Sequence, residues 1–189
     1  MTTRDDLVER ARSGEADAWS ELYEATTGRL LVWLRTRPSR DVAVAPEDVV
    51  SETWLVAAQS IADFTGDRDA FAGWLFGIAR NVSLNVRRRS ERRRTDPTDS
   101  GEHPELWGVV DGVAESVAAS DWVSRQLATL SPREADVIAA MEVAGLDAQQ
   151  AAAALDMSVT AVRVARHRAI GRLRRSAEPR PAAMPVKPA

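Results

Sequence analysis

The residues LSPRE at positions 130–134 contain three signals for the start of one helix. Ser131 can cap the first turn, and Pro132 suits a position whose amide has no intrahelical partner. Glu134 stands three residues after the serine, where a capping box needs a carboxylate. A helix is therefore predicted to begin at about Pro132.

Two further helices are predicted after this start. Gly145 can close the first helix, and Asp147 with Gln150 forms the capping-box pattern of the next one. Ser158 follows a tight turn and is the expected cap of a last helix that runs to about Arg175. This succession of short helices predicts a helix-turn-helix.

The last helix is predicted to have an apolar face and a polar face. Its inward residues at helical spacing are Val159, Val162, Ala169, Ile170 and Leu173. The residues expected to face away are Thr160, Ala161, Val164, Ala165, Arg168, Arg172 and Arg175, flanked by Arg163 and His167.

Position along the last helix suggests how its polar face would bind DNA. Residues near the start of a second helix in the major groove read bases, and later arginines contact phosphates. We expect Thr160 and Arg163 to read bases, with phosphate contacts from Arg168, Arg172 and Arg175. The alternative is a solvated helix whose basic residues complement the dipole at its carboxyl end.

Charge divides the chain into three blocks. Residues 1–94 contain as many acidic as basic residues, and residues 95–121 contain seven acidic residues and no Lys or Arg. Residues 122–189 contain ten basic and six acidic residues. Because the middle block opens with TDPTDSGEHP, which disfavours helix and strand, it predicts a flexible acidic linker. We expect one domain over 1–94, the linker over 95–121, a second domain over 122–176 and a disordered Pro- and Ala-rich tail over 177–189.

The amino-terminal domain has the periodicity of three longer helices after a short opening helix. We expect them over about 15–35, from Pro46 onward, and over about 69–89. The helix at Pro46 begins with carboxylates near the positive end of its dipole. Its residues predicted to face solvent are Glu47, Asp48, Ser51 and Glu52. No period-two strand is present, so the predicted fold is all-α, with two small helical domains, the second a helix-turn-helix.

An arginine cluster, RRRSERRR at residues 87–94, ends the third long helix. Such a cluster can neutralise several phosphates, with a contribution that weakens as salt rises. The alternative is a solvated helix end stabilised by the dipole. A second basic surface on the same chain favours nucleic-acid binding.

Composition excludes several classes of function. The formal net charge is −3, no apolar run reaches the length of a membrane span, and the amino end lacks the pattern of a signal peptide, so we expect a cytoplasmic protein. Without cysteine, and with only two histidines, no metal site or cofactor is expected. We also find no phosphate-binding glycine loop and no nucleophile motif, and therefore predict that the chain is not an enzyme.

Two stretches of the amino-terminal half resemble a known family. PEDVVSETW at 46–54, followed by FAGWLFGIARN at 71–81 with trailing arginines, resembles region two of the extracytoplasmic-function (ECF) sigma factors. The carboxyl half resembles their region four. The resemblance covers nearly the whole chain. It implies that the protein binds core RNA polymerase and directs it to promoter DNA, with regulation by a separate anti-sigma protein.

The resemblance also implies roles for individual residues. Polymerase would be bound by Glu47, Asp48, Ser51 and Glu52. An unstacked base of the minus-ten element would be captured near the loop at 63–68, and the minus-ten positions are Phe64, Arg68, Arg80, Asn81, Asn85, Arg87 and Arg88. The minus-thirty-five element would be bound as duplex by Ser158, Thr160, Ala161, Arg163, Val164, Arg168 and Arg172.

The chain departs from the family pattern at four positions. Ser51 stands where glutamine is usual, and Asn85 where aspartate is usual. On the last helix, Ala165 replaces a common arginine and Arg166 a commonly buried leucine. Because Arg166 falls on the inward stripe, it must extend to the domain edge or pair with a carboxylate.

Two hypotheses stay open beside this one. A conventional helix-turn-helix regulator would bind an operator without polymerase, using its amino-terminal domain to sense a signal or to dimerise. The acidic linker, in turn, would either thread toward the polymerase cleft, fold over the arginine cluster in the free protein, or serve solubility alone.

Overall fold

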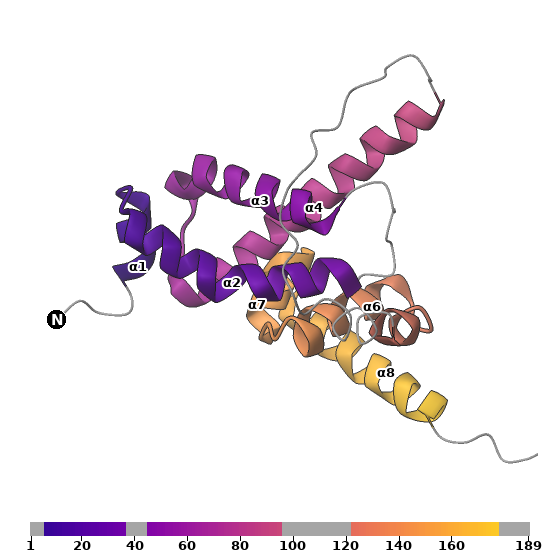
Figure 1. Ribbon diagram of the computed structural model, residues 1–189. Coiled ribbons are helices and arrows are strands. Elements are labelled where there is room, and N and C mark those ends of the chain that lie inside the picture. The colour runs from indigo at the N-terminus through magenta and orange to yellow at the C-terminus, as the bar shows by residue number, and fades with distance from the viewer. Residues whose placement is uncertain (1–5, 37–44, 96–121, 178–189) are drawn as a thin grey trace, which may run out of the picture.

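The structure is a computed structural model that describes residues 6–36, 45–95 and 122–177. Within these ranges every regular element is a helix (Figure 1), as predicted. Except for Thr95 and Ala177, which end helices, the predicted acidic linker and tail lie outside the described residues.

In the amino-terminal half, the described residues form four α-helices. They are α1 (Leu7–Arg12), α2 (Ala16–Thr36), α3 (Pro46–Ser60) and α4 (Arg68–Thr95), with the 3₁₀ turn η2 (Ile61–Asp63) between the last two. The predicted start of α3 at Pro46 is confirmed. The helix predicted to end near residue 89 continues to Thr95, so the whole arginine cluster is helical.

Over residues 122–177, the part of the carboxyl-terminal half that the structure describes, there are five helical segments. A turn of helix over 122–127 precedes α6 (Pro132–Ile138), which continues into the π-helix η3 (Ala139–Val143). The helix-turn-helix consists of α7 (Ala148–Leu155) and α8 (Val159–Ala177).

Local capping contacts explain where these helices begin. The Ser131 amide and hydroxyl both donate to one Glu134 carboxylate oxygen, at 3.2 and 2.7 Å. Asp147 accepts from the amide of Gln150 at 2.8 Å, and the Gln150 side chain accepts in return from the Asp147 amide. The Ser158 hydroxyl accepts from the Ala161 amide at 3.2 Å. The predicted caps are thus confirmed.

A single apolar core extends through both halves of the molecule. In the amino-terminal half, α4 contributes the buried Phe71, Leu75 and Phe76. The Phe76 ring lies 5.2 Å from the ring of Trp33 on α2, centroid to centroid. In the carboxyl-terminal half, α6, α7 and α8 contribute the buried Val137, Ala151 and Val162.

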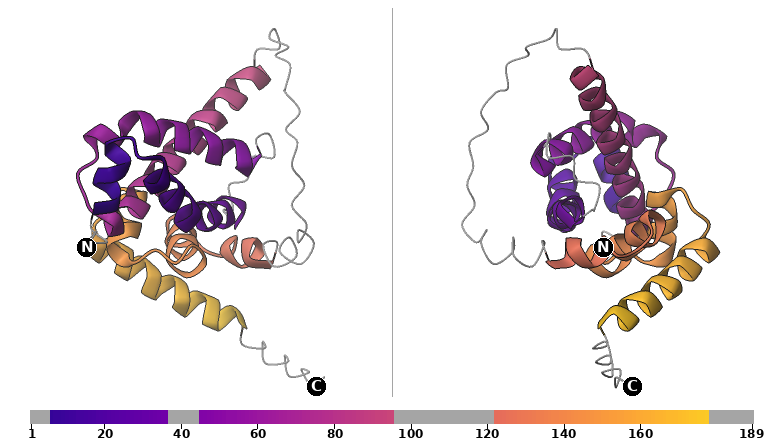
Figure 2. Two further views of the ribbon diagram at one scale, coloured as in Figure 1. Left: turned by 60° about the vertical axis from the view of Figure 1, so that its left-hand side comes forward. Right: turned by 90° about the vertical axis from the view of Figure 1, so that its right-hand side faces the viewer.

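The two halves pack against each other where α7 lies along α4 (Figure 2). Glycine makes this approach possible: a Cβ atom added at Gly73 would lie 2.8 Å from the Gln150 Cα and carbonyl oxygen. One turn later, a Cβ at Gly77 would lie at ordinary contact distance from the Ala153 carbonyl oxygen, 3.6 Å. The sequence predicted two domains on a tether and gave no indication of this contact.

Hydrogen bonds between the two halves accompany the apolar contact. Arg29 of α2 donates to the carbonyl oxygens of Ala144 at 2.7 Å and Gly145 at 2.9 Å, which end the π-helix. The Gln150 amide group donates to the Asp69 carbonyl at 2.7 Å. The Ala144 and Gly145 carbonyls follow the end of η3, where main-chain carbonyls have no intrahelical partner, so Arg29 supplies one from the opposite half.

Candidate nucleic-acid and protein interfaces

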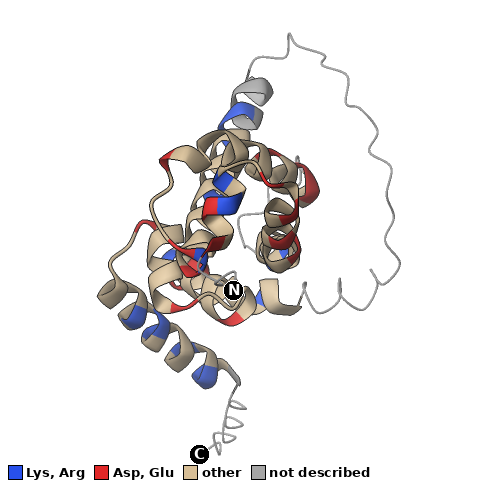
Figure 3. Ribbon diagram, turned by 90° about the vertical axis from the view of Figure 1, so that its left-hand side faces the viewer, with Lys and Arg blue, Asp and Glu red and all other residues tan. Residues whose placement is uncertain are grey.

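The first candidate surface is the acidic face of α3. Glu47, Asp48, Ser51 and Glu52 are all exposed, as predicted, because the opposite side of the helix is packed inward. Leu55 continues the same face and is 58% exposed. The face therefore combines carboxylates with one apolar side chain, and acidic residues gather on the α2–α3 side of the molecule (Figure 3).

The carboxylates on this face differ in their surroundings. Glu47 accepts a hydrogen bond from Arg35 of α2 at 2.5 Å. Partial burial, the largest single influence, acts to raise the pKa of Glu47. The hydrogen bond from Arg35, a backbone hydrogen bond and the positive charge of Arg35 together outweigh it and hold that pKa below its usual value. Since Glu47 already has a cationic partner, Asp48 and Glu52 are the carboxylates better placed to meet a second protein.

A cavity of about 490 Å³ lies beside the loop that joins η2 to α4. Its wall combines the loop with one side of α4 and a single residue of α7, and it is lined by Asp63, Phe64, Thr65, Ala70, Trp74, Gly77, Ile78, Asn81 and Ala153. The Phe64 ring is 7% exposed and lies 4.7 Å from the Trp74 ring. Phe64, predicted to bind DNA, therefore shapes the wall more than it offers an open stacking face.

The other predicted minus-ten residues lie along α4. Asn81, Asn85, Arg87 and Arg88 are exposed, and Arg80 is partly buried. A smaller cavity of about 180 Å³ between α3 and α4 includes Glu52, Asn81 and Asn85. Arg68, in the first turn, pairs with Glu21 of α2 at 2.9 Å. Asn81 therefore borders both cavities and Asn85 the smaller one, while exposed guanidinium groups follow further along the helix.

The exposed face of α8 forms the third candidate surface. Its exposed residues include Thr160, Arg163, Val164, His167, Arg168, Arg172 and Arg175, with Ala161 partly covered and Ser158 at the cap. Basic residues follow one another along this helix (Figure 3). The prediction that Ala165 faces away is wrong: it is 9% exposed and packs inward, because α8 turns this position toward the rest of the domain.

Two arginines of α8 have carboxylate partners. Arg166, predicted to need one or to reach the domain edge, donates to Glu142 at 2.6 Å and is partly exposed. Arg172 donates to Glu134 at 2.9 Å. Arg172 was predicted to contact phosphate; in this structure it also connects α8 to the cap of α6.

Glu134 has a pKa below its usual 4.5, mainly because the Ser131 hydroxyl donates to it, with Arg172 nearby. The ionised form is stabilised by folding, so this contribution is present above the usual pKa and is lost as pH falls through the lowered one. We expect Glu134→Gln to lower the free energy of unfolding by about 1 kcal/mol at neutral pH. The difference should shrink below about pH 4.

Thermal unfolding of both proteins across this pH range measures the effect. Glu142→Gln is the matched control, because its pair with Arg166 is exposed and should contribute less. A Glu134→Gln deficit that stays constant with pH would contradict the role of the charge.

Sequence reasoning missed Trp74 and Ala153 as cavity residues. Trp74 is partly buried and lines the cavity with Asn81. Their spacing of two helical turns was the available signal for a shared face. Ala153 had no such signal, because it reaches the cavity only through the packing of α7 on α4.

Two family models match the segments of the chain that carry these surfaces. Residues 21–94 match the model of Sigma-70 region 2, and residues 120–173 match that of Sigma-70, region 4. The chain is 30% identical over 179 residues to the ECF RNA polymerase sigma factor ShbA of Streptomyces griseus subsp. griseus, covering 91% of this chain and 94% of ShbA. The chain belongs to the ECF RNA polymerase sigma factors.

Solved structures agree with this fold. CnrH, in complex with the cytosolic domain of CnrY, matches with a TM-score of 0.66 at 24% identity over 94% of this chain and 100% of CnrH. The sigma factor RpoE, in complex with the anti-sigma factor NepR from Bartonella quintana, matches with a TM-score of 0.57 at 20% identity over 86% of this chain and 99% of RpoE.

As an ECF sigma factor, the protein binds core RNA polymerase and directs it to promoter DNA. Sigma factors are transcription initiation factors, not enzymes. Of the helices in the described ranges, none has the length and apolar character needed to cross a membrane.

Proposed function

We propose that this sigma factor divides its three surfaces among three partners. The exposed carboxylates of α3 dock on core polymerase, with Asp48 and Glu52 as the main contacts. The cavity beside the η2–α4 loop receives an unstacked base of the minus-ten element, and the polar side of α4 holds the adjoining strand. The start of α8 reads the minus-thirty-five duplex in its major groove.

The observation that supports this proposal best is the cavity beside Phe64. It is bordered by the Trp74 ring and by the polar Asn81, which suits a planar ring with a hydrogen-bonding edge. The arginines of α4 continue from the same helix and suit the phosphates that follow.

We also propose where the protein acts, how its chain is divided into domains and what kind of protein regulates it. The protein acts in the cytoplasm, with its domains divided as 1–94, 95–121, 122–176 and 177–189. An anti-sigma protein controls its access to polymerase; the RpoE–NepR complex, a fold relative, supports this partner class.

Selection of fragments from random duplex DNA tests which surface binds which promoter element. Core polymerase with this chain should enrich fragments that contain two short motifs at a fixed spacing, whereas the chain alone should enrich far less. Arg163→Ala should alter only the upstream motif, and Asn81→Ala only the downstream one. Strong enrichment of a single motif by the chain without core polymerase would contradict the proposal and favour an operator-binding regulator.

A further inference from the structure

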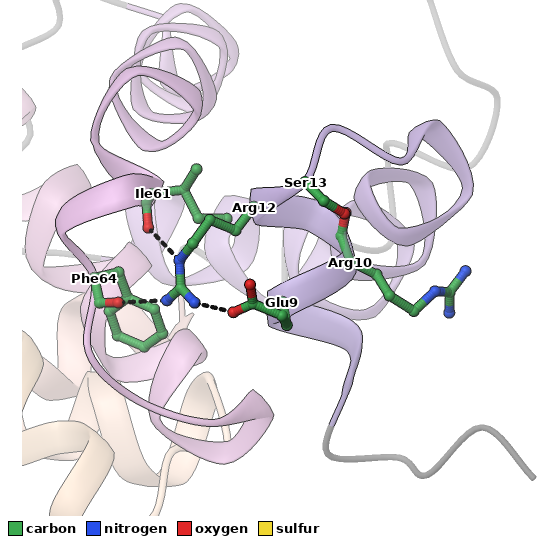
Figure 4. Close-up of polar contacts among 6 residues, drawn as sticks. All are labelled: Glu9, Arg10, Arg12, Ser13, Ile61 and Phe64. Atoms are coloured by element: carbon green, nitrogen blue, oxygen red, sulfur yellow. Dashed lines mark hydrogen bonds and ion pairs between the residues drawn. The ribbon is translucent and has the colours of Figure 1, made fainter.

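Arg12, the last residue of α1, contacts the loop that forms the cavity (Figure 4). Its guanidinium donates to the carbonyl oxygen of Phe64 at 2.6 Å and, at a longer 3.4 Å, to that of Ile61. The remaining terminal nitrogen pairs with Glu9, one turn earlier on the same helix. One side chain therefore bonds to the first residue of η2 and to the residue that follows η2.

The loop has few other restraints of this kind. Within it, the Phe64 amide donates to the Ile61 carbonyl at 3.2 Å. At its far end, the Asp67 side chain accepts from the Ala70 amide at 2.9 Å and starts α4. Residues 65–67 between these points are exposed. The Phe64 ring is held by its packing on Phe71 and Trp74. The Phe64 carbonyl is held by Arg12, which lies 52 residues earlier in the sequence.

The chemistry of this contact requires arginine. A guanidinium presents several N–H donors in a fixed plane, so it can bond two carbonyls and a carboxylate together. Bonds from a charged donor are shorter and stronger than neutral ones. The Arg12 side chain is 30% exposed, which shields these bonds partly from competing water. A lysine would offer a single point of charge without this geometry.

We propose that Arg12 is a positioning residue for minus-ten base capture. It does not contact the base; it holds Phe64, and with it Asp63 and Thr65, so that the cavity has its shape before DNA arrives. Preorganisation of this kind favours binding because less conformational freedom is lost on capture. The inference rests on the proposed function of the cavity.

Arg10 provides a matched control on the same helix. Its guanidinium points away from the loop (Figure 4) and pairs with Glu15 at 2.8 Å. Arg10→Gln and Arg12→Gln remove the same charge from α1, but only the second removes the bonds to Ile61 and Phe64. Any effect of charge on DNA approach is therefore common to both variants.

The experiment measures promoter opening by the holoenzyme, using the duplex that the wild-type holoenzyme selects from random DNA, with a fluorescent base analogue in its downstream motif. At saturating holoenzyme, Arg12→Gln should open this duplex about tenfold more slowly than Arg10→Gln, the effect of losing one charge-assisted bond. Core-polymerase affinity and initial duplex binding should match wild type. Arg12→Lys should recover only part of the rate.

A second measurement follows the loop itself. In the free chain, hydrogen exchange at the Phe64 amide should be faster in Arg12→Gln than in Arg10→Gln, while exchange in α3 stays unchanged. Equal opening rates for the two variants, equal Phe64 exchange, or a defect fully accounted for by weaker core binding would each overturn the role of Arg12. A wild-type holoenzyme that fails to open its selected duplex would instead overturn the proposed function of the cavity.

Discussion

Reversing two charges on α3, in the double variant Asp48→Arg, Glu52→Arg, is expected to abolish co-elution with core RNA polymerase. Both side chains are exposed on the same face, one helical turn apart, beside the exposed Leu55. A partner surface complementary to carboxylates would then meet two cations, and like charges in an interface cost several kcal/mol. We expect affinity to fall on the order of a hundredfold or more, measured by gel filtration and by a titration with labelled sigma factor.

An equal change of net charge elsewhere separates docking from bulk electrostatics. Asp17→Arg, Glu24→Arg places the same charges on exposed positions of α2 and should change affinity little. The neutral variant Asp48→Asn, Glu52→Gln should lose less than the reversal. Similar losses for the α2 and α3 reversals would contradict docking through α3.

Replacing Gly73 by alanine is expected to disrupt the packing of α7 on α4. The added Cβ would lie 2.8 Å from the Gln150 Cα and carbonyl oxygen, which belong to the backbone and cannot rotate away. Overpacking of this kind costs about 1–3 kcal/mol of unfolding free energy, and the higher helix propensity of alanine recovers about 1 kcal/mol at most. Urea unfolding measures the loss.

Gly77→Ala is the matched control, one turn further along α4. There the Cβ would make ordinary contact with the Ala153 carbonyl at 3.6 Å, so helix propensity should dominate and stability should rise by up to about 1 kcal/mol. Small-angle scattering shows whether Gly73→Ala separates the halves, as a larger radius of gyration. Unchanged stability and radius in Gly73→Ala would mean that α7 does not lie on α4 in solution.

The sequence predicted the features whose causes are local. Helix starts at Pro46, Ser131, Asp147 and Ser158 depend on side chains within three or four residues, so spacing alone revealed them. The acidic face of α3 was predicted for the same reason, because helical periodicity separates its exposed residues from buried ones.

Features that join distant segments were not predicted. The bonds from Gln150 to Asp69 and from Arg29 to Ala144 connect residues 81 and 115 positions apart, and no periodic pattern marks such pairs. Ala165 was assigned to the wrong face because a small apolar side chain fits either side of a helix and gives no polarity signal. The place of Ala153 in the wall of the larger cavity was not predicted, because it depends on the packing of α7 on α4.

The presence of Ala153 in the wall of that cavity has a thermodynamic consequence. A molecule that fills the space beside Phe64 and Trp74 meets atoms from both halves of the chain. Its binding free energy is therefore linked to that of the α4–α7 contact, and by reciprocity each equilibrium shifts the other by the same factor. Substitutions at Gly73 or Gln150, which do not line the cavity, thus act on its occupancy through this linkage.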